Sequence, residues 1–152
     1  PNAKYVVQKG EWDFAFKANA RARASYRPDD FVPLMDHGQI QFVDGDSEIV
    51  PGVHVRITGG HTSHHQVVYF YSGDNKGVYF ADILPTKAHL SPPWVMGYDL
   101  RPLDLIEEKA TLLTAAVKES AYLFFEHDPY LDVTQVASDK GDFMAQGRFR
   151  LT

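Results

Sequence analysis

Three of the chain's seven histidines lie within five residues, in the segment Thr58-Gly59-Gly60-His61-Thr62-Ser63-His64-His65. The segment follows an alternating run from Val53 to Ile57, a pattern typical of a strand. Two glycines allow the backbone to turn sharply where that strand ends. A histidine placed there stands at the rim of a sheet, where metal ligands and catalytic groups are commonly found. The same residues also fit a polar surface loop that is rich in histidine without binding a metal.

Two further apolar runs each lead to a side chain that can bind a metal. The run Gly77–Ala81 precedes Asp82, and the run Ala121–Phe125 precedes Glu126 and His127. The chain contains no cysteine, which excludes disulfides, thiolate metal sites and cysteine nucleophiles. Any metal would therefore be held by imidazole and carboxylate groups, a ligand set suited to zinc, manganese or iron.

Ligands of the types His, Asp and His, each following a strand, resemble the C-terminal half of the metallo-β-lactamase-fold hydrolases. In that family the first histidine of a T-P-G-H-T-x-G-H loop binds one metal, a later aspartate bridges two metals, and a final histidine binds the second. The resemblance implies that His61 and His127 each bind one metal and that Asp82 is the bridging catalytic residue. It also implies a cofactor of two divalent metals, zinc or else manganese or iron.

The chain departs from the family pattern in two ways. Gly59 and His64 stand where the usual loop has proline and glycine, while His65 matches the second histidine, which orients a ligand rather than binding metal itself. The H-x-H-x-D-H motif that supplies four more ligands in the family does not occur in these 152 residues. We therefore expect a fragment or processed product whose own three ligands leave a two-metal site incomplete.

Composition narrows the class of protein. A chain of 152 residues with 44% hydrophobic and 13% aromatic residues can bury a core and corresponds to one domain or part of one. A net charge of −5 argues against a nucleic-acid partner. There is no apolar run long enough to cross a membrane and no signal segment at the start, so a cytoplasmic enzyme is the default expectation.

The remaining patterns predict an α+β fold. We expect an αβ/βα sandwich of the metallo-β-lactamase type, of which residues 1–152 form a single partial domain, the C-terminal half to two-thirds. Strands are predicted at 4–8, 39–43, 53–58, 66–71, 77–81, 132–137 and 143–151. The strand at 39–43 should have one buried face, and those at 66–71 and 77–81 should be covered on both faces and form a hairpin.

One long helix is predicted late in the chain. Asp99 would cap it and Pro102 would lie in its first turn. Its buried stripe would consist of apolar residues spaced three and four apart, namely Leu103, Ile106, Ala110, Leu113 and Val117. Glu107 and Glu108 are interpreted as solvated charges.

The irregular stretch Pro85–Leu100 is long for a compact domain, which favours a functional loop. The candidates for the substrate pocket are His64, His89, Trp94 and Tyr98. For His89, an ordinary surface position in the loop fits equally well.

The resemblance implies a hydrolase of esters, lactones or thioesters that uses a metal-bound hydroxide in the intact protein and acts on a small molecule. Acyl-homoserine lactonases are similar in having this aspartate and a final F-x-H-D, here Phe125–Asp128, although many of them have tyrosine where this chain has Pro85. One alternative is an inactive or metal-poor fragment that needs a missing N-terminal half or a partner chain. A small binding module with a surface histidine cluster is another. We expect either a homo-oligomer or pairing with the missing segment.

Overall fold

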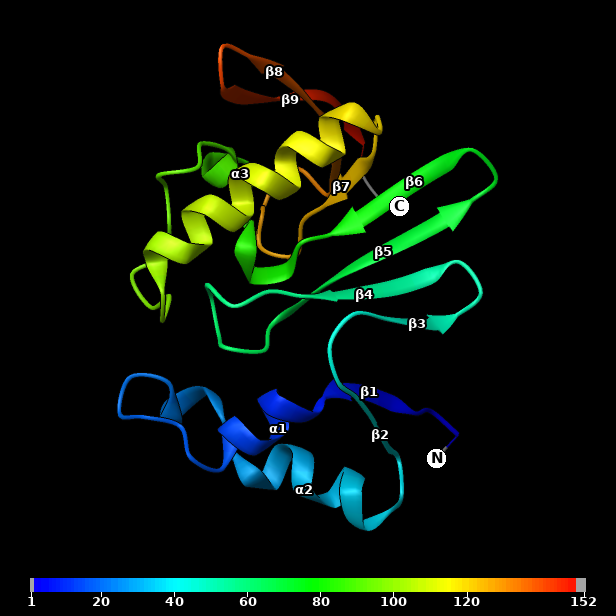
Figure 1. Cartoon of the computed structure of the whole chain (residues 1–152), viewed down its shortest axis with the longest axis vertical. Coiled ribbons are helices and arrows are strands. Elements are labelled where there is room, and N and C mark those ends of the chain that lie inside the picture. The colour runs from blue at the N-terminus through cyan, green and yellow to red at the C-terminus, as the bar shows by residue number, and fades with distance from the viewer. Residues whose placement is uncertain (1, 150–152) are drawn as a thin grey trace.

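Nine strands form two sheets in the computed structural model, which describes residues 2–149 (Figure 1). The smaller sheet pairs β1 with β2 in parallel. The larger has seven strands in chain order, antiparallel except for the parallel pair β6–β7. The strands are β1 (Tyr5–Gln8), β2 (Ile40–Val43), β3 (Ser47–Val50), β4 (Val53–Ile57), β5 (Gln66–Ser72), β6 (Asn75–Tyr79), β7 (Tyr122–Phe124), β8 (Val133–Asp139) and β9 (Asp142–Phe149).

The helices fall into two groups, one between β1 and β2 and the other between β6 and β7. They comprise α1 (Lys9–Ala15), α2 (Pro28–Asp36) and α3 (Pro102–Lys118), with shorter 3-10 turns η1 (Arg23–Ser25), η2 (Ala81–Ile83) and η3 (Lys87–Leu90). The expected α+β class is confirmed. The predicted β5–β6 hairpin is also confirmed, with its turn at Gly73, whose φ of 57° suits glycine. Part of the last predicted strand, Arg150 and Leu151, lies outside the described residues.

The N-terminal segment forms its own layer below the seven-stranded sheet (Figure 1). Trp12 of α1 holds this layer together through edge-to-face contacts with Phe16, Phe31 and Phe42, at ring-centroid distances of 5.1–5.6 Å. The prediction that β2 buries one face is wrong, because none of its residues is fully buried and Phe42 remains 40% exposed.

The main core lies between α3 and the seven-stranded sheet. Leu105, Leu112, Leu113 and Ala116 of α3 belong to one buried cluster with sheet and loop residues that include Val67, Val78, Phe80, Leu123 and Val136. The other face of the sheet carries a groove of about 260 Å³ lined by apolar side chains, among them Phe70 and Phe124. The prediction that β5 and β6 are covered on both faces is therefore wrong for the part of the chain that the structure describes.

The predicted stripe of α3 is only partly correct: Leu113 is fully buried and Val117 packs against the core, but the stripe is displaced in the first turns of the helix. The buried residues are Leu105, Lys109, Leu112, Leu113 and Ala116, whereas Leu103 is 76% exposed. Both stripes have helical spacing, but the true one contains a lysine. A charged residue is almost never fully buried, so the sequence pattern favoured the wholly apolar alternative. Within residues 2–149, no helix has the length and hydropathy needed to cross a membrane.

The register of α3 predicts a difference between two leucines of the same helix. Leu113→Ala should lower the free energy of unfolding by about 2–5 kcal/mol, because Leu113 is fully buried and its truncation leaves a cavity. Leu103→Ala should change it by less than about 0.5 kcal/mol. Urea unfolding followed by circular dichroism measures both. A larger loss for Leu103→Ala would restore the stripe expected from the sequence.

Candidate metal centre

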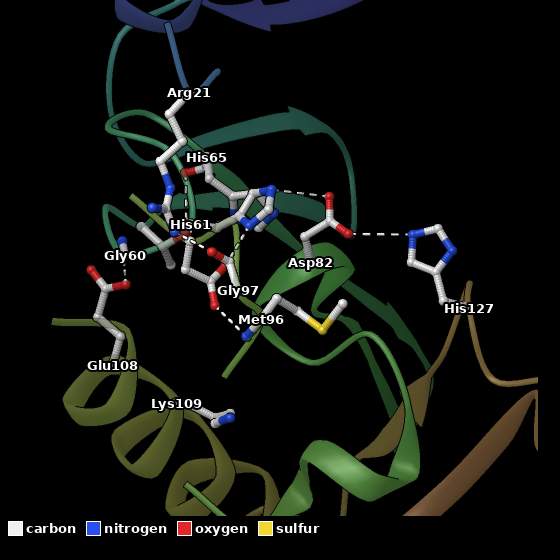
Figure 2. Close-up of polar contacts among 12 residues, drawn as sticks. Arg21, Gly60, His61, His65, Asp82, Met96, Gly97, Glu108, Lys109 and His127 are labelled. Carbon is white, nitrogen blue, oxygen red and sulfur yellow. Dashed lines mark hydrogen bonds and ion pairs between the residues drawn. The ribbon is translucent and has the colours of Figure 1, made fainter. Parts of the chain in front are cut away.

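The three predicted ligands meet in one cavity. His61, Asp82 and His127 line a cavity of about 640 Å³, together with residues of the N-terminal layer. Asp82 lies between the two histidines (Figure 2). Its Oδ2 is 3.3 Å from His61 Nε2, and its Oδ1 is 3.3 Å from His127 Nε2. Each carboxylate oxygen therefore faces a different imidazole.

The parallel pair β6–β7 sets Asp82 beside His127. Tyr79 of β6 is paired with Phe124 of β7, and each metal-binding candidate lies three residues further along its own chain segment. Asp82 is in η2, just beyond the strand, after Ala81, whose φ of 48° is unusual for a residue other than glycine. The sequence therefore placed these candidate ligands at the same end of the two paired strands, although neither of them is in a strand.

The His61 loop is held by the start of α3. The Glu108 carboxylate accepts hydrogen bonds from the backbone N–H groups of Gly59 and Gly60, at 2.8 and 2.9 Å. Arg101 Nε donates to the Gly59 carbonyl at 3.0 Å. A Cβ at Gly60 would overlap the backbone of Leu105, so the close approach of loop and helix requires glycine there. The interpretation of Glu108 as a solvated charge is wrong.

Asp99 is a buried carboxylate that fixes the orientation of His61. Its Oδ1 accepts a hydrogen bond from His61 Nδ1 at 2.8 Å, and its Oδ2 accepts one from the backbone N–H of Met96 at 2.6 Å. The predicted helix cap is wrong: the N-cap of α3 is Arg101, and Asp99 is only 1% exposed. With Nδ1 bound to Asp99, His61 Nε2 is directed toward Asp82, the arrangement that holds metal-binding histidines in other proteins.

The electrostatics of the cavity favour positive charge. Burial lowers the pKa of His61, but hydrogen bonds with Asp82 and Asp99 outweigh it and raise the pKa to about 9. The hydrogen bond with His61 in turn lowers the pKa of Asp82. Burial and, to a smaller extent, neighbouring His61 lower the pKa of His65 to about 4, so His65 is neutral at pH 7. Below these groups, burial lowers the pKa of Lys109 to about 8.

The other histidines differ in what they touch. His65 Nδ1 is 2.7 Å from Thr58 Oγ1, and its Nε2 is buried with no hydrogen-bond partner among the described residues. His64 lines the cavity, with its ring against Gly10. Among the substrate-pocket candidates, Tyr98 also lines the cavity, whereas the described lining does not include His89 or Trp94. His89 Nδ1 instead lies 2.8 Å from Thr86 Oγ1, and Trp94 is 62% exposed.

The wall opposite the sheet comes from the N-terminal layer. Arg21 and Tyr26 line the cavity there. Arg21 donates a hydrogen bond to the Gly97 carbonyl, which joins this layer to the long loop (Figure 2). Tyr26 donates to Glu11, whose other carboxylate oxygen accepts the His64 backbone N–H at 3.1 Å. The sequence did not identify these contacts because each joins residues that are distant in the chain.

The donor set fits a divalent first-row metal. Nitrogen and oxygen donors converge from His61, Asp82 and His127, the chemistry that zinc and similar ions bind. For tetrahedral bonds of roughly 2.1 Å, the ligand atoms around one ion are about 3.4 Å apart. The 3.3 Å between each Asp82 oxygen and its facing Nε2 matches that spacing. Such a set can hold cations that activate water.

Substitution of Glu107 and of Glu108, neighbours in α3, should change the free energy of unfolding by very different amounts. Glu108→Gln should lower the free energy of unfolding by about 1–3 kcal/mol, because an amide NH₂ cannot accept the hydrogen bond that a carboxylate oxygen accepts. Glu107→Gln, on the exposed side, should change it by less than about 0.5 kcal/mol. Chemical unfolding of both variants measures the difference, and equal effects would contradict the role of Glu108.

The Asp99 contact should give a stability difference that depends on pH. In the metal-free chain Asp99 stabilises protonated His61, whose folded pKa of about 9 exceeds the ordinary 6.5. That stabilisation is complete below pH 6.5 and lost as pH rises through 9. Asp99 also attracts Lys109, whose pKa is about 8. That attraction is likewise lost as the pH rises, so it adds to the same pH dependence.

We therefore expect Asp99→Asn to cost more stability at about pH 6 than at about pH 10, measured by urea unfolding across this range. The matched control is Asp104→Asn. Asp104 pairs with Arg101 at 3.2 Å, and because arginine stays charged throughout the range, its cost should not vary. A cost for Asp99→Asn that is constant with pH would contradict the assignment.

Comparison with known proteins agrees with this geometry. The model of the metallo-beta-lactamase superfamily matches residues 3–127. An N-acyl homoserine lactonase of Bacillus thuringiensis is 28% identical over 130 residues, which cover 84% of this chain and 48% of the relative. The chain thus spans about half the length of the curated relatives it matches.

Solved structures give the same result. A probable metal-dependent hydrolase from Staphylococcus aureus is 28% identical with a TM-score of 0.82, over 98% of this chain and 54% of that one. The dizinc quorum-quenching lactonase AidC, solved with a product, shares the fold with a TM-score of 0.78 at 20% identity, over 100% of this chain and 57% of that one. The family model covers most of the chain and the fold agrees, so this chain belongs to the metallo-β-lactamase superfamily.

Proposed function

We propose that this chain is part of a metal-dependent hydrolase of esters, lactones or thioesters. The observation that carries the proposal is the position of Asp82, whose two oxygens each face the Nε2 of a different histidine at 3.3 Å inside a cavity. A carboxylate in this position can bridge two cations. Such pairs of cations are roughly 3.5–4 Å apart in two-metal hydrolases.

Each residue has a role that its contacts support. His61 and His127 would each bind one cation through Nε2, and Asp82 would bridge the two. Asp99 holds the Nδ1–H of His61 and thereby presents Nε2 as the donor atom. When bound, the cations would lower the pKa of a water molecule and polarise the carbonyl oxygen of the substrate. To bind a cation, His61 would have to lose the proton that Asp82 and Asp99 favour.

The cavity and the relatives support a proposal for the substrate class. Its volume of about 640 Å³ suits a small molecule, with Tyr98 and His64 in the wall. The curated relatives are N-acyl homoserine lactonases, and one solved neighbour is a dizinc lactonase. We therefore propose a lactone or related acyl ester as substrate and zinc as the metal, with manganese or iron as alternatives that have compatible ligands.

A second possibility is a metal-poor chain that requires ligands from elsewhere. It is favoured by one observation: the H-x-H-x-D-H motif does not occur in these 152 residues, and the chain spans about half of its relatives. In that case a further segment, a partner chain or a second copy would complete the site. The groove beside Phe70 and Phe124 offers an apolar surface for such an addition.

The proposal predicts unequal effects of two substitutions in the functional protein that includes these residues. Asp82→Ala should abolish binding of both metals and reduce hydrolysis of a model lactone to background. His65→Ala should retain metal and lose about 10–100-fold in activity, because His65 acts on the site only through its neighbours. Metal content by mass spectrometry and turnover are measured side by side. Full metal content and activity in Asp82→Ala would refute the proposal.

A further inference from the structure

We propose that Glu126 is a metal ligand that, with Asp82 and His127, gives this chain a complete cation-binding site of its own. The inference rests on the proposed function, in which Asp82 and His127 bind a divalent cation. It adds a residue for which the resemblance implies no role. It also changes the expected behaviour of the chain, because one of the two metal positions would then have three protein ligands from these 152 residues.

The geometry supports a single ion held by these three side chains. His127 Nε2 lies 3.3 Å from Asp82 Oδ1 and 3.3 Å from Glu126 Oε1. One ligand atom from each of the three residues lies within 4.8 Å of the others. Ligand atoms around a tetrahedral ion with bonds of roughly 2.1 Å are about 3.4 Å apart. The separations from His127 Nε2 therefore match those expected for three donors on a common ion.

The sheet positions Glu126 for this role. Tyr79 of β6 pairs with Phe124 of β7, and Glu126 follows Phe124 by two residues. The Tyr79 hydroxyl donates a hydrogen bond to Glu126 Oε2, so Oε1 is the oxygen that faces His127. Tyr79 thus orients the carboxylate in the same way as Asp99 orients His61. Glu126, Asp82 and His127 all line the cavity, where an ion can reach them.

The charges of the cluster point to a cation. Asp82 forms its ion pairs with His61 and His127, and Glu126 forms one with His127. Imidazoles balance these carboxylates only when protonated. A divalent ion would instead balance both carboxylates while His127 stays neutral as a ligand. The competing explanation is a partly exposed Glu126–His127 ion pair, a contact worth about 0–1 kcal/mol that has no consequence for metal binding.

The ligand types suggest which metals Glu126 affects most. Two carboxylates and one imidazole form an oxygen-rich set, and carboxylates suit Mn²⁺ better than imidazole does. Loss of the Glu126 carboxylate should therefore weaken Mn²⁺ binding more than Zn²⁺ binding. This selectivity would not arise if Glu126 only paired with His127 or only contributed negative charge to the surface.

The test is titration of the metal-free 152-residue chain with Zn²⁺ and with Mn²⁺ by calorimetry, comparing wild type with Glu126→Gln, Asp82→Asn and Glu107→Gln. Glu126→Gln should weaken binding of the first ion at least about tenfold, since a lost ligand should cost no less than a lost outer contact. The loss should be greater for Mn²⁺. Its free energy of unfolding without metal should fall by no more than about 1 kcal/mol, because the Glu126–His127 ion pair is partly exposed. Glu107→Gln removes the same charge far from the cluster and should bind as wild type does.

The outcomes separate the two proposals. If Asp82→Asn abolishes binding while Glu126→Gln binds as wild type does, the role of Glu126 is overturned and the proposed function stands. If Asp82→Asn binds both ions as tightly as wild type, both proposals fail. If Glu107→Gln weakens binding as much as Glu126→Gln, net charge explains the effect and the role of Glu126 is overturned.

Discussion

The parallel pairing of β6 with β7 is the constraint on which the site depends. It aligns Tyr79 with Phe124, so that Asp82 and His127 emerge side by side from neighbouring segments. Parallel strands cannot be joined by a tight turn and need a long crossover, usually one that contains a helix. Here the crossover contains the Pro85–Leu100 stretch and α3. The connection that the pairing requires also supplies Asp99 and Glu108, which hold the third candidate ligand, His61, and its loop in place.

The His61 loop illustrates how packing and charge act together. Gly60 allows α3 to approach closely, and Glu108 accepts both glycine N–H groups that this approach buries. Asp99 then fixes the imidazole itself. Burial lowers the pKa of His61, but the hydrogen bonds with Asp82 and Asp99 outweigh it and raise the pKa to about 9 in the absence of metal. The same field that favours a proton on His61 favours a cation in the cavity.

Much of this arrangement could be predicted from the sequence. Apolar runs that precede His61, Asp82 and His127 placed three candidate ligands at one sheet edge, and the structure brings them together. The contacts of Asp99, Glu108 and Glu126 could not be predicted. From the sequence, Asp99 is interpreted as a helix cap and Glu108 as a solvated charge, and nothing distinguishes Glu126. Only the three-dimensional structure reveals the partners of these carboxylates.

Lys109 shows why the errors about α3 and the loop before it arose close to the site. It is fully buried in α3 and donates a hydrogen bond to the Trp94 carbonyl, so it ties the long loop to the helix close to Asp99. The buried face of a helix is predicted from the spacing of its apolar residues, and a buried lysine interrupts that spacing. The prediction therefore assigned Leu103 to the buried face instead of Lys109. Asp99 and Glu108 likewise depart from the expectation that charged side chains face solvent, because both accept hydrogen bonds from the His61 loop. Departures from local sequence rules are expected at functional sites, where charged groups are buried to hold reactive side chains. In this chain the buried charged residues therefore indicate the site as clearly as the histidines do.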